Sequence, residues 1–451
     1  MDNGVRAVGE EFEALARLVR RVDDHAEARL GLLAEAAGVV EERRPASGAA
    51  RAALADRIER WRYQLINHRS GRLTDVEAEL ARRIDWLMVA VRGRGPRGPR
   101  SLREALAAAP ADDGAARYLD PGLPIARVED EARTVTGQFF SAPAAGGARR
   151  TMVLYAPLYV SNHCINHCLY CGFRYPQAMT REQLDVDQAV AEAAVLGQRG
   201  FRHLLVVAGE HPHLVTVDYL GGISSALARQ GYAVGIEVAP QGTLAYERLH
   251  EAGVSSVTLY QETYDEVLYA RFHPKGTKAW YDWRLEGPER AAEAGIERLG
   301  LGVLLGLGDP AAELRALIAH GRYLLGRFPG VSLSFGLPRI REAPEGFSPP
   351  RPVDEEMLIR IACALRVAFP AAHLVLSTRE SPALRDRLAG VCITQMSAGS
   401  STAPGGYTTA HEASCDRQQL PVFDRRTPAE VVSHLADRGF EVRWEFEPAA
   451  R

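Results

Sequence analysis

The chain of 451 residues lacks long apolar segments. Its most apolar stretches, Leu299 to Leu307 and Leu374 to Leu376, are strand-sized, whereas a membrane-spanning helix needs roughly 18 apolar residues. The first residues, MDNGVRAVGEEFEALARL, are polar and acidic and have neither the basic nor the apolar part of a secretion signal. These absences predict a cytoplasmic protein without a membrane segment.

The chain also lacks a surplus of charge of either sign. Its formal net charge is -3, and no window combines a run of Lys and Arg with interleaved aromatic residues, so nothing resembles a nucleic-acid-binding surface. Hydrophobic residues make up 46% and charged residues 25%, an ordinary globular composition that can bury a large core. The expected partner is a small molecule.

The N-terminal part of the chain reads as helices without strands. Apolar residues recur at three-four spacing from Phe12 to Ala26, which is typical of one helix face. Further helices are expected over 49–68 and 74–91, the second opening with a Thr–Asp pair that suits an N-cap. The Gly- and Pro-rich stretch at 92–100 resists helix and sheet, and we interpret it as a linker.

From Met152 onward, short apolar runs alternate with amphipathic helices, which is typical of βα repeats. Strands are expected over 152–159, 203–208, 233–238, 256–260, 299–305, 331–337, 373–377 and 392–396, and helices over 186–199, 311–328, 355–369 and 427–440. Eight strands with intervening helices favour an α/β fold of the closed (β/α)8 TIM type over an open sheet. We expect two domains, a helical N-terminal extension over 1–115 and the barrel over 116–451.

Cysteine is scarce, and its distribution is uneven. Three of the six cysteines are scattered and read as buried thiols, namely Cys363, Cys392 and Cys415. The other three form a CxxxCxxC motif, namely Cys164, Cys168 and Cys171. In a cytosolic chain of this size such a trio indicates metal or redox chemistry rather than a disulfide framework.

The CxxxCxxC motif admits two interpretations. A structural zinc site needs four protein ligands, and only His163 or His167 stands near enough in sequence to be the fourth. Three thiolates instead suit a 4Fe-4S cluster, in which the fourth iron stays open for S-adenosylmethionine (SAM). We favour the cluster, because the motif directly follows the first strand of the expected barrel.

Polar side chains stand at the C-terminal ends of several expected strands. They are Glu210, Glu237, Glu262, Arg379 and Ser397. A barrel carries its active site at that end, and a charged residue there is costly unless it meets a polar ligand. Any one of them alone could be a salt bridge at the rim, but the five together predict a binding site.

Several segments are similar to the aromatic amino acid lyases of the radical SAM superfamily. They run from Ala156 to Phe173, Tyr260 to Gly276, Asp282 to Leu307, Leu337 to Arg341, Leu376 to Asp386 and Ser397 to Tyr407. The resemblance is greatest to the 2-iminoacetate synthases of thiamin biosynthesis, which are tyrosine lyases, and to their relatives in diiron hydrogenase maturation. It implies a 4Fe-4S cluster on the three clustered cysteines and SAM bound beside it.

The resemblance also implies residues that bind SAM. They are Tyr170, Gly209, Glu210, Glu237, Glu262 and Arg284. Tyr170 would lie against the adenine, although simple loop packing is an alternative for it. Glu210 would receive the amino group, and the guanidinium of Arg284 is apt to clamp a carboxylate.

For the substrate, the resemblance implies that Arg379 and Ser397 hold the carboxylate of an amino acid, with Tyr159 beside it and His273 near the phenol. The reaction would break the Cα–Cβ bond of tyrosine and give 2-iminoacetate and p-cresol. Tryptophan or another amino acid is an alternative substrate, and a non-catalytic cluster-binding protein is a more remote alternative. The expected partners are a low-potential electron donor of the flavodoxin or ferredoxin type and a downstream enzyme that accepts the product. No second cysteine pair is present, so one cluster is expected.

Overall fold

A computed structural model describes most of the chain and divides it into two compact units, Met1–Glu104 and Ala105–Arg451. The described residues are 2–23, 25–41, 45–67, 74–93, 101–110, 114–144, 147–344, 346–409 and 417–446. Cys415 and residues 94–100 of the expected linker lie outside them. The domain boundary expected at 115–116 falls inside the second unit.

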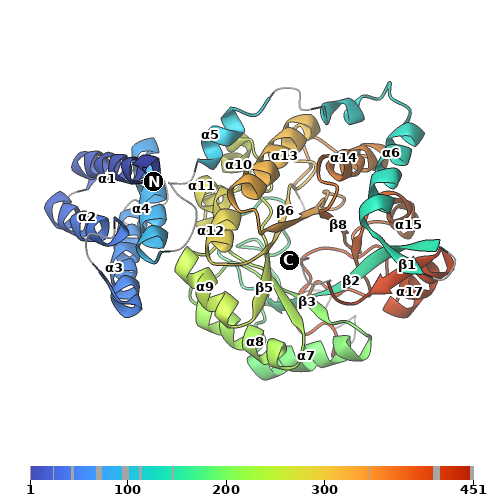
Figure 1. Cartoon of the computed structure of the whole chain (residues 1–451). Helices are drawn as coiled ribbons and strands as arrows, with labels where there is room; N and C mark the ends of the chain where they lie inside the picture. The colour runs from blue at the N-terminus through green and yellow to red at the C-terminus, as the bar shows by residue number, and fades with distance from the viewer. Residues whose placement is uncertain are drawn as a thin grey trace. The chain divides into compact units, whose positions relative to one another are not determined.

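The first unit is built of helices alone within its described residues (Figure 1, blue). Its long helices are α1 (Asp2–Val22), α2 (Ala26–Val40), α3 (Gly48–Asn67) and α4 (Asp75–Val91). The Thr–Asp pair starts α4 as expected. The Thr74 hydroxyl accepts the N–H of Glu77, and the Glu77 carboxylate accepts the N–H of Thr74 at 2.8 Å, which forms a capping box.

The apolar face expected from Phe12 to Ala26 is interrupted. Helix α1 ends at Val22, and Ala26 begins α2 instead of continuing α1. The reason lies in Asp23, whose carboxylate accepts the N–H of His25 at 2.9 Å and so competes with the helical hydrogen bonds.

The second unit is a closed barrel of eight parallel strands surrounded by helices, which confirms the expected fold (Figure 1). Its strands are β2 (Gly147–Ser161), β3 (His203–Ala208), β4 (Ala233–Glu237), β5 (Val254–Thr258), β6 (Arg298–Gly302), β7 (Ser332–Gly336), β8 (His373–Leu376) and β9 (Gln395–Ser397). Strand β9 pairs with β2, with Tyr155 opposite Ser397, and this pairing closes the ring.

Helices cover the outside of the barrel, and shorter ones carry the loops at its ends. They are η1 (Ala116–Leu119), α6 (Ile125–Phe139), α7 (Val186–Gln198), α8 (Val217–Arg229), α9 (Thr243–Glu251), α10 (Glu266–Phe272), η2 (Thr277–Ala279), α11 (Tyr281–Leu285), α12 (Gly287–Glu293), α13 (Pro310–Arg327), α14 (Glu355–Ala368), α15 (Pro382–Val391) and α17 (Pro428–Asp437). Helix α5 (Leu102–Ala107) crosses the boundary between the two units. None of the helices in the described part of the chain is long and apolar enough to cross a membrane.

The two faces of the strands differ in chemistry. Residues that point outward are apolar and buried, for example Leu204 and Val206 on β3 and Leu301 on β6. Residues that line the lumen alternate with them and are often small or polar, for example Ser334 and Gly336 on β7. The apolar layer between strands and helices therefore stabilises the fold, while the lumen has room for ligands.

Two strands outside the ring were not expected. Strand β1 (Ser141–Ala144) pairs antiparallel with the start of β2, and β10 (Phe440–Arg443) pairs parallel with it. The expectation of a helix reaching residue 440 is therefore wrong. Helix α17 ends at Asp437, and Gly439, with φ 81°, turns the chain into β10. The alternating apolar and polar residues of FEVRWEF, from 440 to 446, were the signal for this strand.

Candidate active site

The three clustered cysteines lie on the loop that follows β2, at the C-terminal end of the barrel. Backbone hydrogen bonds fasten this loop to its neighbours, since Ile165 donates to the Glu210 carbonyl at 3.0 Å and Leu169 donates to the Phe272 carbonyl at 3.1 Å. Gly209 at the end of β3 permits the approach, because a Cβ there would collide with the His163 carbonyl and lie 3.2 Å from the Cβ of Cys164. Gly209, which was expected to bind SAM, therefore also gives the cysteine loop room to approach β3.

The burial and the pKa of the thiols on this loop are compatible with binding a metal cluster. Cys168 is 4% exposed, while Cys164 and Cys171 are partly buried. Burial, together with the neighbouring Cys171 thiol, raises the pKa of Cys164 to about 11. Thiolates form in such a place only beside positive charge, which iron supplies, and thiolates are the usual ligands of Fe–S clusters. Within the described residues, no three His, Cys, Asp or Glu side chains gather as the ligands of one metal ion.

Beside the cysteine loop, four charged side chains form a largely buried group, which we call the charged group: Glu210, Glu262, Lys278 and Arg284. Arg284 donates from Nη1 to Glu210 Oε1 at 3.1 Å, from Nη2 to Glu262 Oε1 at 3.4 Å and from Nε to the Tyr260 carbonyl at 2.6 Å. Lys278 Nζ donates to Glu262 Oε1 at 2.6 Å. Two carboxylates thus balance two cations.

This geometry changes the expectation for Arg284. A clamp on the carboxylate of SAM would need free guanidinium donors, but three of the five are used inside the protein. Glu210 is held further by the amide of Asn166, which donates to Oε2 at 2.7 Å, and by the hydroxyl of Thr277 at 3.2 Å. Asn166, Thr277 and Lys278 were missed, since they stand in loops and no spacing in the sequence marks them.

Glu262 carries the clearest backbone strain at this end of the barrel. Its φ is 71°, and it is the only non-glycine residue with positive φ in the described part of the chain. Such a conformation costs on the order of 1–3 kcal/mol and persists where the surroundings impose it, often at functional sites. Here the Glu262 carbonyl accepts the N–H of Leu304 at 2.8 Å. Burial alone would raise the pKa of Glu262, but Lys278 and Arg284 hold that pKa below its ordinary value.

Tyr170 and His273 lie together next to the charged group. The Tyr170 hydroxyl and His273 Nε2 are 2.7 Å apart, and His273 Nδ1 is 2.8 Å from the Tyr269 carbonyl. Both ring nitrogens of His273 therefore have partners, and its side chain is 1% exposed. His273 does not line the cavity described next, so the expected place near a substrate phenol is not supported by the geometry.

The barrel lumen opens at this end into an upper cavity of about 100 Å³. Four residues expected at the site line it, namely Tyr159, Glu237, Arg379 and Ser397. Ser397 is buried, and its hydroxyl accepts the N–H of Thr378 at 3.1 Å. The structure thus brings the three residues expected to hold a substrate carboxylate to one cavity, and it adds Glu237, which had been expected among the SAM-binding residues.

Arg379 is one of two arginines that line the upper cavity, and the other, Arg339, is paired with Glu380. Within the described residues, the Arg379 guanidinium makes one hydrogen bond, from Nη2 to the Arg339 carbonyl at 3.4 Å, and it has no carboxylate partner. Its neighbour Glu380 cannot serve, because Glu380 accepts two hydrogen bonds at 2.7 Å from Arg339. Most donors of Arg379 therefore remain available to a ligand in the cavity.

Glu237 is the acid of the upper cavity. Burial and the negative charge of Glu262, opposed by Arg284, Lys278 and Arg379, together raise its pKa to about 7. A carboxyl group with this pKa can hold or release a proton near neutral pH. Beside Arg339 and Glu380, which also line the cavity and pair with each other, the cavity therefore presents one further cation and one titratable acid. These two groups are the complements of the two charged groups of a free amino acid.

Gln419 links the upper cavity to the cysteine loop and was missed in the sequence. Its Oε1 accepts the hydroxyl of Tyr159 at 2.7 Å, and its Nε2 donates to Cys171 Sγ at 3.8 Å. One side chain thus touches both a wall of the cavity and an expected cluster ligand. No motif marks Gln419, which lies far along the chain from both partners.

Comparisons with known families agree with this site. Residues 158–320 match the radical SAM superfamily, and residues 337–441 match the biotin and thiamin synthesis associated domain. The first match contains the three cysteines and the charged group. The second contains Arg379, Ser397 and Gln419.

Individual relatives are similar over most of their length. The chain is 35% identical over 367 residues to 2-iminoacetate synthase of Escherichia coli (strain K12), covering 81% of this chain and 94% of the relative. It is 36% identical over 332 residues to 2-iminoacetate synthase of Salmonella typhimurium, covering 73% and 84%. The crystal structure of HydG, a maturase of the FeFe-hydrogenase, superimposes with a TM-score of 0.67 and 29% identity, covering 86% of this chain and 80% of HydG. These findings confirm the resemblance.

Proposed function

Because the chain belongs to the radical SAM family of 2-iminoacetate synthases, we propose that it is a lyase that cleaves the Cα–Cβ bond of tyrosine to give 2-iminoacetate and p-cresol. The observation that carries the proposal is the upper cavity, in which a guanidinium with available donors and a titratable carboxyl group face the same space. An amino acid in its zwitterionic form complements both groups.

On this proposal, the cysteine loop holds the cofactors. Cys164, Cys168 and Cys171 would bind three irons of a 4Fe-4S cluster, and Glu210 and Glu262 would receive polar groups of SAM. When bound, the reduced cluster and SAM supply the 5'-deoxyadenosyl radical that removes a hydrogen atom from the substrate. Arg284 and Lys278 keep Glu262 ionised, and their ion pairs hold both Glu210 and Glu262 in place.

The substrate would lie in the upper cavity with its carboxylate on Arg379. A guanidinium can hold a carboxylate through two parallel hydrogen bonds, which fixes both its place and its orientation. Glu237 would then face the amino group, and above its pKa of about 7 it accepts a hydrogen bond from that group as a carboxylate. Ser397 and Tyr159 complete the wall. Holding the amino group in one orientation is what a directed hydrogen abstraction requires.

The partners of the reaction follow from its chemistry. Reduction of the cluster needs one electron at low potential, so we propose a donor of the flavodoxin or ferredoxin type. The product 2-iminoacetate hydrolyses to glyoxylate, so we also propose a downstream enzyme that takes it up before hydrolysis.

Product analysis tests the proposed function. Anaerobically reconstituted protein, incubated with SAM, dithionite and either tyrosine or tryptophan, should release p-cresol and glyoxylate from tyrosine, together with 5'-deoxyadenosine. Turnover of tryptophan without turnover of tyrosine would overturn the substrate and leave the radical SAM chemistry standing. Absence of 5'-deoxyadenosine with either amino acid, in protein that carries its cluster, would overturn the enzyme assignment.

A further inference from the structure

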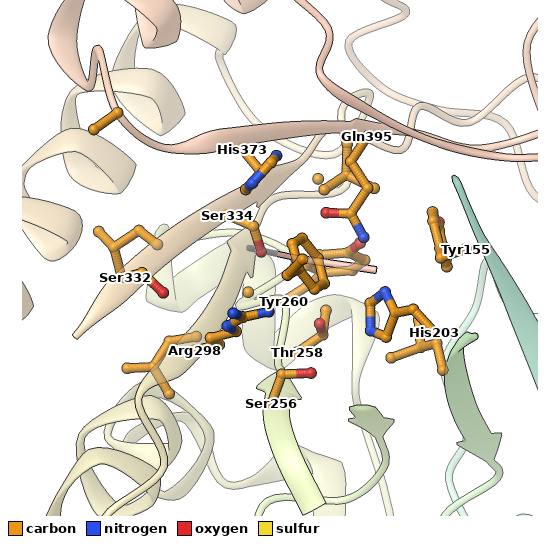
Figure 2. Close-up of a pocket in the computed structure, with 18 residues that line it drawn as sticks. Tyr155, His203, Ser256, Thr258, Tyr260, Arg298, Ser332, Ser334, His373 and Gln395 are labelled. Carbon is orange, nitrogen blue, oxygen red and sulfur yellow. The ribbon is translucent and has the colours of Figure 1, made fainter. Parts of the chain in front are cut away.

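Three tyrosines line the upper cavity, and one of them is hydrogen-bonded toward the cysteine loop. Tyr155 and Tyr260 also line a second cavity, which lies deeper in the lumen among the first residues of the strands (Figure 2). Of these two cavities, Tyr159 lines the upper one alone. Its hydroxyl donates to Gln419 Oε1 at 2.7 Å. Tyr159 is therefore the tyrosine whose hydrogen bond connects the wall of the upper cavity to a residue beside the expected cluster ligands.

The backbone at Gln419 is held directly against the cysteine loop. The Gln419 N–H donates to the Thr402 carbonyl at 3.0 Å, and the Thr402 hydroxyl donates to the Leu420 carbonyl at 2.7 Å. Gly172, which follows the last expected cluster ligand, makes room for this approach, because a Cβ there would collide with the Gln419 carbonyl. The side chain of Gln419 therefore starts from a fixed point next to Cys171.

The two partners of the Gln419 amide determine its orientation. Its Nε2 donates to Cys171 Sγ at 3.8 Å. A sulfur that ligates iron carries no proton and can only accept a hydrogen bond, so the amide nitrogen has to face Cys171. The amide oxygen then faces Tyr159, whose hydroxyl has to be the donor. Burial, together with the negative charge of Glu237, raises the pKa of Tyr159 well above its ordinary value, so the hydroxyl keeps the proton that it donates.

Each thiol of the cysteine loop has a different group beside it that favours negative charge on sulfur. Burial raises the pKa of Cys164 and of Cys168, but two backbone N–H groups oppose the rise at Cys164, and the ammonium group of Lys278 opposes it at Cys168. At Cys171 the corresponding group is the side-chain amide of Gln419. Hydrogen bonds to the sulfurs are among the features that set the reduction potential of an Fe–S cluster.

We propose that Gln419 is a positioning residue that raises the reduction potential of the cluster by donating to Cys171 Sγ, and that Tyr159 holds the Gln419 amide in the orientation that this requires. The inference rests on the proposed function, because it needs a cluster on the three cysteines. Reduction transfers one electron from the low-potential donor to the cluster and makes its sulfur atoms more negative. An N–H donor to sulfur therefore stabilises the reduced form more than the oxidised form.

A potentiometric titration of the reconstituted full-length protein, followed by electron paramagnetic resonance, tests this proposal without substrate or turnover. In Gln419→Leu the ratio of reduced to oxidised cluster at a fixed potential should fall about tenfold, which is a shift of the midpoint potential by about 59 mV toward more negative values for a one-electron couple. Gln419→Glu keeps an acceptor for the Tyr159 hydroxyl but replaces the donor to Cys171 by a carboxylate. It should therefore shift the midpoint potential further in the same direction than Gln419→Leu does.

Two further variants separate the role of Tyr159 from a general disturbance of the site. Tyr159→Phe leaves the donor of Gln419 in place but removes the hydrogen bond that orients it, so it should shift the midpoint potential in the same direction by less than Gln419→Leu does. Gln183→Leu is the matched control. Gln183 is a partly buried glutamine whose amide donates to the Leu214 carbonyl at 3.0 Å, and it is not among the residues that line the upper cavity. The midpoint potential of Gln183→Leu should equal that of the unmodified protein.

Iron analysis and circular dichroism of each variant show whether it folds and carries its cluster, and if Gln419→Leu does not, Gln419→Glu decides in its place. The proposal is overturned if the midpoint potential of the deciding variant equals that of Gln183→Leu or is more positive. In that case the cluster and the proposed function still stand. Unmodified protein that takes up no iron and sulfide would overturn the cluster and this inference together. A shift in the deciding variant without any shift in Tyr159→Phe would overturn the role given to Tyr159.

Discussion

Two arginines at the same end of the barrel have opposite surroundings. Arg284 is buried among carboxylates and gives three hydrogen bonds to Glu210, Glu262 and the Tyr260 carbonyl. Within the part of the chain that the structure describes, the Arg379 guanidinium gives one long hydrogen bond to a carbonyl, and it faces a cavity. Both were expected from the sequence to clamp a carboxylate of a ligand. Arg284 uses three of its five donors inside the protein, whereas most donors of Arg379 are available to a ligand. An arginine that is paired with carboxylates of the protein stabilises the site, whereas one that has no such partner among the described residues can bind a ligand.

The first prediction concerns the cluster, because the proposed functions of both arginines require it. Cys168→Ala should abolish iron and sulfide incorporation and all formation of 5'-deoxyadenosine, because two thiolates cannot hold the cubane. Iron analysis and electron paramagnetic resonance of the reconstituted protein measure this loss. Cys363→Ala is the control, since Cys363 is a buried thiol of α14 outside the loop. A full complement of iron in Cys168→Ala would contradict the cluster assignment.

The second prediction separates the two arginines by stability. Arg284→Met should lower the free energy of unfolding by about 3–5 kcal/mol, because it leaves two buried carboxylates with one cation. Arg379→Gln should change it far less, because Arg379 has no carboxylate partner among the described residues. Urea unfolding of the protein without cofactors measures both changes. Arg248→Met, which breaks an exposed pair with Asp218, is the control and should cost about 0–1 kcal/mol. Equal losses of unfolding free energy in Arg284→Met and Arg379→Gln would contradict the difference that we infer between the two arginines.

The third prediction distinguishes Arg379 from Arg284 by its effect on substrate binding. Arg379→Gln should raise the KM for tyrosine about ten- to a hundredfold, because a charge-assisted hydrogen bond contributes about 1.5–3 kcal/mol. Binding of SAM, measured by equilibrium dialysis, should stay as in the unmodified protein. If Arg379→Gln instead impairs SAM binding and leaves the KM for tyrosine unchanged, the assignment of the upper cavity to the substrate is wrong.

The fourth prediction uses the acid that faces Arg379. The pKa of Glu237 is about 7 in the folded protein, above its unfolded value of about 4.5, so its contribution to stability is complete below pH 4.5 and is lost as the pH rises through 7. Between pH 5 and pH 8 the unmodified protein should therefore lose on the order of 2 kcal/mol more than Glu237→Gln does. Urea unfolding at the two pH values measures this difference. A loss of the same size in Glu237→Gln would show that another group titrates.

The sequence predicted the barrel because its strands follow a simple rule. Apolar residues on the helix-facing side of each strand recur throughout the chain, and they mark strands such as β3 to the residue. Strands β1 and β10 were missed because they are short and pair with a part of β2 outside the ring. Their stability comes from that pairing, although for β10 the alternation of FEVRWEF was also a local signal.

The candidate site was predicted where residues stand at strand ends, and missed where loops meet. Glu210, Arg379 and Ser397 follow apolar runs, so their type and position marked them. Lys278 and Gln419 reach the site from the connections between strands and helices. The sequence of such a connection does not show which part of the barrel it folds back against. The partners of Arg284 were likewise beyond sequence, because a guanidinium suits a ligand and a neighbouring carboxylate equally well.

The claim that Arg379 holds the carboxylate of the substrate is tested most directly by comparing tyrosine with tyramine, which lacks that carboxylate. Their affinities for anaerobic protein loaded with its cluster and SAM are measured by calorimetry, with and without Arg379→Gln. We predict that the unmodified protein binds tyrosine at least about tenfold more tightly than tyramine, and that Arg379→Gln removes most of this preference. A preference for tyrosine that survives unchanged in Arg379→Gln would contradict the account.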